Sequence, residues 1–166
     1  QYYIDHEWFL EAGEGLPTHK EPPNHGGKGR RFQLTSGHNR WSIHSMNMTN
    51  NIILNTHRGE PFAFLNDRDA KDLGISNGDQ VRLVSNDGEC RLAAKVTASC
   101  RPGQVILYNG FEPYMHENWD SQSDLEAGHV KHLGMVGGYG HLQYRVFSWQ
   151  PIPADRGVRI DVEKIA

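Results

Sequence analysis

The stretch that decides the fold runs from residue 65 to residue 88 and reads LNDRDAKDLGISNGDQVRLVSNDG. A short helix is expected near its start, because Asn66 or Asp67 can cap the first turn with a side-chain oxygen. Asp69 then places a carboxylate in that turn, where the helix dipole favours negative charge. Gly74 stands where a left-handed glycine commonly ends a helix, so the stretch predicts one short, well-bounded helix.

The same stretch continues into a hairpin. Val81 and Leu83 alternate with Arg82 and Val84 over residues 80–85, which is read as a strand. Residues 86–88 read Asn-Asp-Gly, which predicts a tight turn, and residues 89–97 form the returning strand.

Further short strands are expected on both sides of this unit. They share brief apolar runs bounded by turn residues, and they cover residues 32–35, 61–66, 105–108 and 158–162. A short helix or turn is expected within residues 47–55. Six or seven short strands with one clear helix favour a small β-barrel over a layered α/β sheet.

Composition limits the function classes. The chain has 166 residues, enough for one domain with its own core. The formal net charge of -3 argues against a nucleic-acid partner held by bulk electrostatics. No run of 18 apolar residues occurs, so no membrane span is expected. Cys90 and Cys100 lack metal-binding spacing; a disulfide between them is possible, but two buried thiols are expected.

Residues 1–30 are expected to form an extended arm, and residues 31–166 the barrel domain. The arm is rich in glycine and proline, and its aromatic side chains, including Trp8 and Phe9, need a surface to pack on. That surface is expected on upstream domains absent from this chain; the alternative is a plain flexible terminus.

A loop of hydrogen-bond donors follows the first strand. His38 and His44 lie six residues apart, with Arg40 and Trp41 between them and several hydroxyl groups around them. A loop dense in donors and short of carboxylates suits an anionic or heteroaromatic ligand. The alternative is a polar surface loop with Trp41 buried beneath it.

Residues 32–104 resemble the C-terminal molybdopterin-dinucleotide-binding domain of the dimethyl sulfoxide reductase superfamily. The resemblance rests on the signature in residues 65–88 and on Arg-Pro-Gly-Gln-Val at residues 101–105. The loop His38-x-Arg40-x3-His44 is similar to that of the nitrate reductase branch. This branch includes selenate, chlorate and perchlorate reductases, dimethyl sulfide dehydrogenase and ethylbenzene dehydrogenase.

The resemblance implies a mainly β fold, a six-stranded double-psi β-barrel with one or two short helices and long loops. It also implies binding of two molybdopterin guanine dinucleotides that hold one molybdenum. The family's iron–sulfur cysteines and its molybdenum ligand belong to upstream domains, so this domain alone is expected to be inactive. The full enzyme would transfer oxygen atoms or electrons at molybdenum.

The implied partners are the upstream domains of the same subunit and an iron–sulfur electron-transfer subunit. The resemblance is compatible with the periplasm or the cytoplasm of bacteria or archaea, and does not decide between them. An alternative function for the barrel is a stand-alone module that binds a protein or peptide. Such a module would need neither the histidine loop nor the aromatic arm.

By resemblance, the histidines at 38 and 44 contact the pterin. By chemistry, Arg40 suits a phosphate, while Ser36, Gly37 and Ser42 suit an anion nest. The full set of predicted cofactor-binding residues is Ser36, Gly37, His38, Arg40, Trp41, Ser42, His44, Asn66, Asp69, Asn109, Gly138 and His141.

Some of these residues have equally simple structural roles. Asn66 and Asp69 could read a guanine edge, or they could serve only to cap the helix. Asn109 and Gly138 could allow close backbone approach, or Gly138 could belong to a mobile glycine loop. His116, outside the set, is expected to be a surface or loop histidine, as are the histidines at 129 and 132.

Overall fold

The computed structural model describes part of the chain. The described residues are 7, 10, 30–38, 40, 46, 50–125, 128–129, 152–153 and 158–165. The chain divides into two compact units, one of residues 1–22 and 128–153 and one of residues 23–127 and 154–166. In the first unit, β6 (Gly128–His129) pairs with β7 (Ile152–Pro153) in a small antiparallel sheet.

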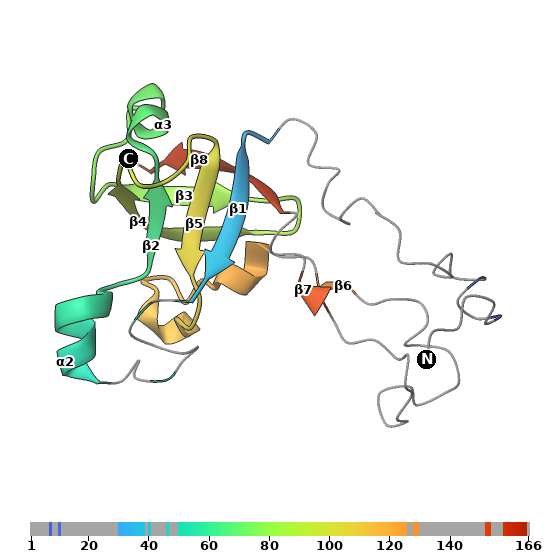
Figure 1. Ribbon diagram of the computed structural model, residues 1–166, viewed down its shortest axis with the longest axis horizontal. Coiled ribbons are helices and arrows are strands. Elements are labelled where there is room, and N and C mark those ends of the chain that lie inside the picture. The colour runs from blue at the N-terminus through green and yellow to red at the C-terminus, as the bar shows by residue number, and fades with distance from the viewer. Residues whose placement is uncertain are drawn as a thin grey trace. The chain divides into compact units, whose positions relative to one another are not determined.

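The second unit contains a closed barrel whose strands follow the order β1-β5-β2-β4-β3-β8 (Figure 1). The six strands are β1 (Phe32–Gly37), β2 (Phe62–Leu65), β3 (Gln80–Val84), β4 (Glu89–Val96), β5 (Gln104–Tyr108) and β8 (Arg159–Lys164). Two neighbouring pairs, β1 with β5 and β2 with β4, are parallel, and the remaining pairs are antiparallel.

The two parallel pairs interlock. β1 and β2 follow each other in the chain but lie on either side of β5. Likewise, β4 and β5 follow each other but lie on either side of β2. The connection from β1 to β2 therefore crosses β5, and the connection from β4 to β5 crosses β2. Two interlocked crossings of this kind form the double-psi arrangement. The predicted six-stranded, mainly β barrel is confirmed.

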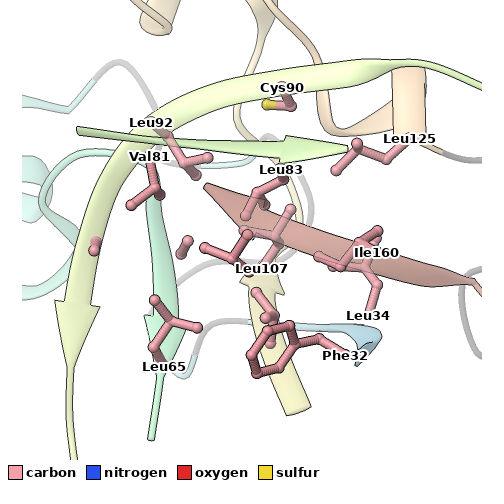
Figure 2. Close-up of a cluster of buried hydrophobic side chains, with 14 of the residues drawn as sticks. Phe32, Leu34, Leu65, Val81, Leu83, Cys90, Leu92, Leu107, Leu125 and Ile160 are labelled. Carbon is pink, nitrogen blue, oxygen red and sulfur yellow. The ribbon is translucent and has the colours of Figure 1, made fainter. Parts of the chain in front are cut away.

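The barrel interior is filled by every second side chain of its strands. Leu34, Leu65, Leu83 and Ile160 come from four different strands and have no exposed surface. Figure 2 shows such side chains pointing toward one another inside the barrel. The alternation of apolar residues in the sequence thus corresponds to the alternation of buried and exposed side chains along the strands.

Helix α3 (Asp67–Asp72) forms as the sequence predicts. The Asn66 side chain accepts a hydrogen bond from the backbone N–H of Arg68 at 2.9 Å, which satisfies one of the free donors of the first turn. Gly74 has a φ of 66°, so it ends the helix in the left-handed conformation.

A second helical segment leads into β2. It begins with α2 (Asn51–Ile53) and continues as one turn of π-helix, η2 (Leu54–Arg58). Asn50 caps it by accepting a hydrogen bond from the backbone N–H of Ile52 at 3.0 Å. The short helix or turn expected within residues 47–55 is therefore present, displaced toward the later residues.

The segment after β5 contains two 3₁₀ turns, η3 (Pro113–Met115) and η4 (Gln122–Leu125). Leu125 is completely buried, and the carboxylate of Asp120 accepts a hydrogen bond from the backbone N–H of Arg91 at 2.7 Å. A Cβ added to Gly88 would collide with the backbone carbonyl of Asp124. The segment is therefore fixed tightly against β4 and the β3–β4 turn.

Both cysteines, Cys90 and Cys100, are buried free thiols, as expected. The described part of the chain contains no helix long and apolar enough to span a membrane.

Candidate functional site

The carboxyl ends of β1 and β5 lie side by side at one end of the barrel. The strands run parallel with Gly37 opposite Tyr108, and the backbone N–H of Asn109 donates to the carbonyl of Gly37 at 2.9 Å. In Figure 1 both arrowheads point away from α3, toward the end where α2 lies. The loops that leave these strands therefore start from one place.

Four predicted site residues surround this place, and we call them the β1/β5 mouth: Ser36, Gly37, His38 and Asn109. Ser36, Gly37 and Asn109 are partly buried, whereas the His38 side chain is exposed. Arg40 follows two residues after the mouth and is also exposed. The mouth combines hydroxyl, amide and imidazole groups within one short region.

Gly37 leaves open space beside its backbone. A Cβ added there would meet no atom within 4 Å, and its φ lies outside the left-handed region. Neither conformation nor crowding within the chain therefore requires glycine at this position, in contrast to the crowding at Gly88. The space is available to a ligand that approaches the backbone closely.

Gln122 is a residue of this region that the sequence reasoning missed. Its side-chain N–H group donates to the Asn109 side-chain oxygen at 3.3 Å, so η4 contacts the mouth. No local pattern marks Gln122, because the contact depends on how the segment after β5 folds back.

Asn66 and Asp69 lie at the opposite end of the barrel. Asn66 directly follows β2, which runs antiparallel to β5, and Asp69 accepts a hydrogen bond from the backbone N–H of Gly103, just before β5 begins. The structure therefore divides the described site residues between two ends. It does not bring Asn66 and Asp69 together with the mouth.

Both of these side chains are engaged within the chain. Asn66 is 4% exposed; besides capping α3, it donates to the carbonyl of Cys100 at 2.7 Å. Asp69 is 5% exposed and accepts from Gly103 at 2.7 Å and from the guanidinium of Arg31 at 2.9 Å. Asn66 therefore has the geometry of a helix cap. That Asn66 or Asp69 hydrogen-bonds to a guanine edge stays a prediction.

The remaining predicted site residues lie outside the described residues. They are Trp41, Ser42, His44, Gly138 and His141. The arm lies outside as well, apart from Glu7, Leu10 and Arg30. What was predicted for these parts of the chain stays a prediction.

His116, expected to be a surface or loop histidine, lies in the loop between η3 and η4, and its side chain is buried. It is 7% exposed, and its ring packs edge-on to Phe111 with 6.5 Å between centroids. Burial lowers the pKa of the imidazole, while the charges of Asp120 and Asp124 and a hydrogen bond with the Arg91 backbone act to raise it. Among the described residues, its Nδ1 is the buried side-chain polar atom without a hydrogen-bond partner.

The sequence is similar to that of subunits of known enzymes. It is 35% identical to the respiratory nitrate reductase subunit alpha of Haloferax mediterranei, over 99% of this chain and 17% of that subunit. It is 30% identical to the chlorate reductase subunit alpha of Ideonella dechloratans, over 99% and 18% respectively. Identity to the dimethylsulfide dehydrogenase subunit alpha of Rhodovulum sulfidophilum is 28%, over 98% and 18%.

The fold is also found in a solved structure. Acetylene hydratase from Pelobacter acetylenicus superposes with a TM-score of 0.60 and 16% identity, over 96% of this chain and 23% of that one. The chain thus spans less than a quarter of the proteins it matches.

A family model settles the assignment. The model described as "Molydopterin dinucleotide binding domain" matches residues 32–130, a segment that begins with β1 and includes the entire β1/β5 mouth. The resemblance to the dimethyl sulfoxide reductase superfamily is confirmed by this match and by the nitrate, chlorate and dimethylsulfide relatives. The chain belongs to the molybdopterin-dinucleotide-binding domain family.

Proposed function

We propose that this chain is the cofactor-binding domain of the catalytic subunit of a molybdenum oxidoreductase, and that it binds a bis-molybdopterin guanine dinucleotide cofactor. The relatives named as alpha subunits of nitrate, chlorate and dimethylsulfide enzymes support this, because each aligns with nearly the whole chain. On this proposal the subunit transfers oxygen atoms or electrons, and other domains supply the molybdenum ligand.

The observation that carries the proposal is the β1/β5 mouth with its open space at Gly37. A molybdopterin dinucleotide presents ring nitrogens and amides, which both accept and donate hydrogen bonds, and a pyrophosphate, which needs hydrogen-bond donors. Hydroxyl, backbone amide, imidazole and side-chain amide groups converge at the mouth, and the exposed guanidinium of Arg40 follows it. The donor set therefore fits such a cofactor.

Each residue has a definite task on this proposal. The open space beside Gly37 lets the cofactor approach the backbone closely. The side-chain amide of Asn109, which Gln122 orients, forms a hydrogen bond with the cofactor. His38 donates a hydrogen bond to a pterin nitrogen. When bound, the cofactor supplies the redox chemistry, and this domain binds and orients it.

The predicted residues outside the described range extend this site. Ser42 joins the anion nest begun by Ser36 and Gly37, and His44 is a second donor to the pterin. Trp41, Gly138 and His141 complete the proposed set. The proposed partners are the other domains of the same subunit and an iron–sulfur electron-transfer subunit.

A glycine pair tests the proposal. In the full-length subunit, Gly37→Ala is expected to leave the fold intact and to reduce cofactor content, because the added methyl group occupies the open space. Gly74→Ala is the control, since it adds the same methyl group at the opposite end of the barrel, by α3; although the positive φ of Gly74 makes it the less stable variant, it should keep the cofactor. Molybdenum and released guanine nucleotide are measured per mole of folded protein.

A Gly37→Ala protein with the same molybdenum and guanine content as the parent would contradict this placement of the cofactor. A parent protein that carries no molybdopterin at all would contradict the proposed function itself.

A further inference from the structure

A groove of about 720 Å³ opens beside the β1/β5 mouth. It lies between the segment that enters β2 and the segment that leaves β5, so its walls reach the same end of the barrel as the mouth. Apolar and aromatic side chains dominate the walls, and we call this the aromatic groove: Leu54, Pro61, Phe62, Phe111, Tyr114 and Met115.

Large apolar side chains stand exposed in this groove and on the helix that borders it. Tyr114, which lines it, is 53% exposed, and Ile52, on α2 next to the lining residue Asn51, is 71% exposed. Single exposed apolar residues are ordinary, but a hollow lined by them marks a surface that another molecule covers.

The wall of the groove also adjoins an unsatisfied polar atom. His116 lines two smaller hollows, each of which shares Pro61 with the aromatic groove. Its Nδ1 is buried without a hydrogen-bond partner. Buried polar atoms are normally paired, so this region lacks a hydrogen-bond partner that the described residues do not provide.

The position of the groove indicates what covers it. Cofactor sites commonly lie where domains meet, and the groove continues the surface around the mouth. Relatives that align with 98–99% of this chain contain more than four fifths of their length outside it. The rest of the same polypeptide is therefore the partner that we expect to cover the groove.

We infer that the aromatic groove is the docking surface for another domain of the same subunit, which inserts an apolar segment there. This inference rests on the proposed function, because it requires a larger subunit. Glu60 lines the groove, and the exposed carboxylates of Glu112 and Glu117 flank its lining residues in the chain. The inserted segment is accordingly apolar and flanked by lysine or arginine.

Thiol labelling of the full-length subunit tests this. Tyr114→Cys places a reporter in the groove, and Ile52→Cys places one on α2, which contributes Asn51 to the groove wall. Ala98→Cys places a control on the exposed turn after β4, at the other end of the barrel. Each protein is labelled with iodoacetamide under native conditions, and modification of the engineered site is followed by peptide mass spectrometry. Mapping by peptide keeps other cysteines out of the measurement.

The expected result is modification at positions 52 and 114 at least tenfold slower than at position 98. The same protection is expected in protein expressed with and without molybdopterin synthesis. Equal rates at all three positions would overturn the inference, since the groove would then be open to solvent.

Two other outcomes would assign the groove to a different occupant and also overturn the inference. Protection that disappears in cofactor-free protein would mean that the cofactor itself covers the groove. Protection that weakens on dilution, together with dissociation of an oligomer, would mean a second copy of the chain. Failure of the proposed function is distinguished separately, by the absence of molybdopterin from the parent protein.

Discussion

The guanidinium of Arg31 lies 2.9 Å from the carboxylate of Asp69 and joins the residue before β1 to helix α3. The other oxygen of the same carboxylate accepts a hydrogen bond from the backbone N–H of Gly103, the residue before β5. One buried carboxylate thus holds together the starts of the two parallel strands whose far ends form the mouth. It sets the relative position of those strands from the opposite end of the barrel.

Asp69→Ala is expected to lower the free energy of unfolding by about 1–3 kcal/mol, because it leaves the partly buried N–H of Gly103 without its acceptor. Asp72→Ala is the control, since Asp72 also contacts Arg31 but its side chain is 65% exposed; it should cost less than about 1 kcal/mol. Urea denaturation measures both. Equal losses of unfolding free energy in the two variants would show that the hydrogen bond between Gly103 and Asp69 contributes no more than the exposed ion pair between Arg31 and Asp72.

Gly74→Ala is expected to destabilise the protein by about 1 kcal/mol, because alanine resists the positive φ that ends α3. Space is not the reason, since a Cβ there meets nothing within 4 Å. Gly37→Ala also adds a methyl group to open space, but without positive φ, and should be nearly neutral. Similar thermal midpoints for the two variants would refute the conformational explanation.

His116 is expected to make the fold less stable in mild acid. Burial lowers the pKa of its imidazole below the ordinary value of 6.5, so near that pH the unfolded chain binds a proton that the folded chain rejects. The contribution of neutral His116 is therefore present above about pH 6.5 and is lost as pH falls through the lowered value.

Replacement isolates this effect from the other histidines. The difference in unfolding free energy between the parent and His116→Phe should shift against the parent between pH 7.5 and pH 5.5, as measured by urea titration. A constant difference over that range would show that the pKa of His116 is not lowered.

Cys90 is expected to respond in the alkaline range. Burial, with help from the charges of Asp120 and Asp124, raises the pKa of its thiol from 9.0 to about 12. Between these values the unfolded chain releases a proton that the folded chain keeps, so stability falls as pH rises above about 9.

Cys90→Ala removes this dependence and should flatten the alkaline part of the stability profile relative to the parent. In the native parent, Cys90 should also react with a thiol reagent only as the protein unfolds. Rapid modification at pH 8 without loss of structure would show that the thiol is accessible.

The elements with local signals were predicted well. The cap at Asn66, the glycine at 74 and the turn at residues 86–88 each act over a few neighbouring residues, so the sequence displays them directly. Pairing of Gly37 with Tyr108 joins residues far apart in the chain, and no local pattern contains it. The number of short strands favoured a small barrel, but its six-stranded double-psi topology was expected only because the family resemblance supplied that long-range information.

The candidate site was predicted less completely, for the same reason. Asn66 and Asn109 carry the same side chain, and nothing near either one reveals that they lie at opposite ends of the barrel. His116 was expected to be a surface or loop histidine, and its burial was not predicted because that burial depends on the segment after β5 folding onto β4. Gln122 was missed because its contact with Asn109 arises from that same fold-back.

The interlocked strands also constrain the order of events during translation. β1 is made first among the barrel strands, yet Gln33 pairs with Gln104 on one side and with Arg159 on the other. Until β8 leaves the ribosome, β1 and β3 both keep an edge whose peptide groups can pair with another nascent chain. A premature stop codon before Val158 would make that hazard permanent, so we expect such truncated products to aggregate or be degraded.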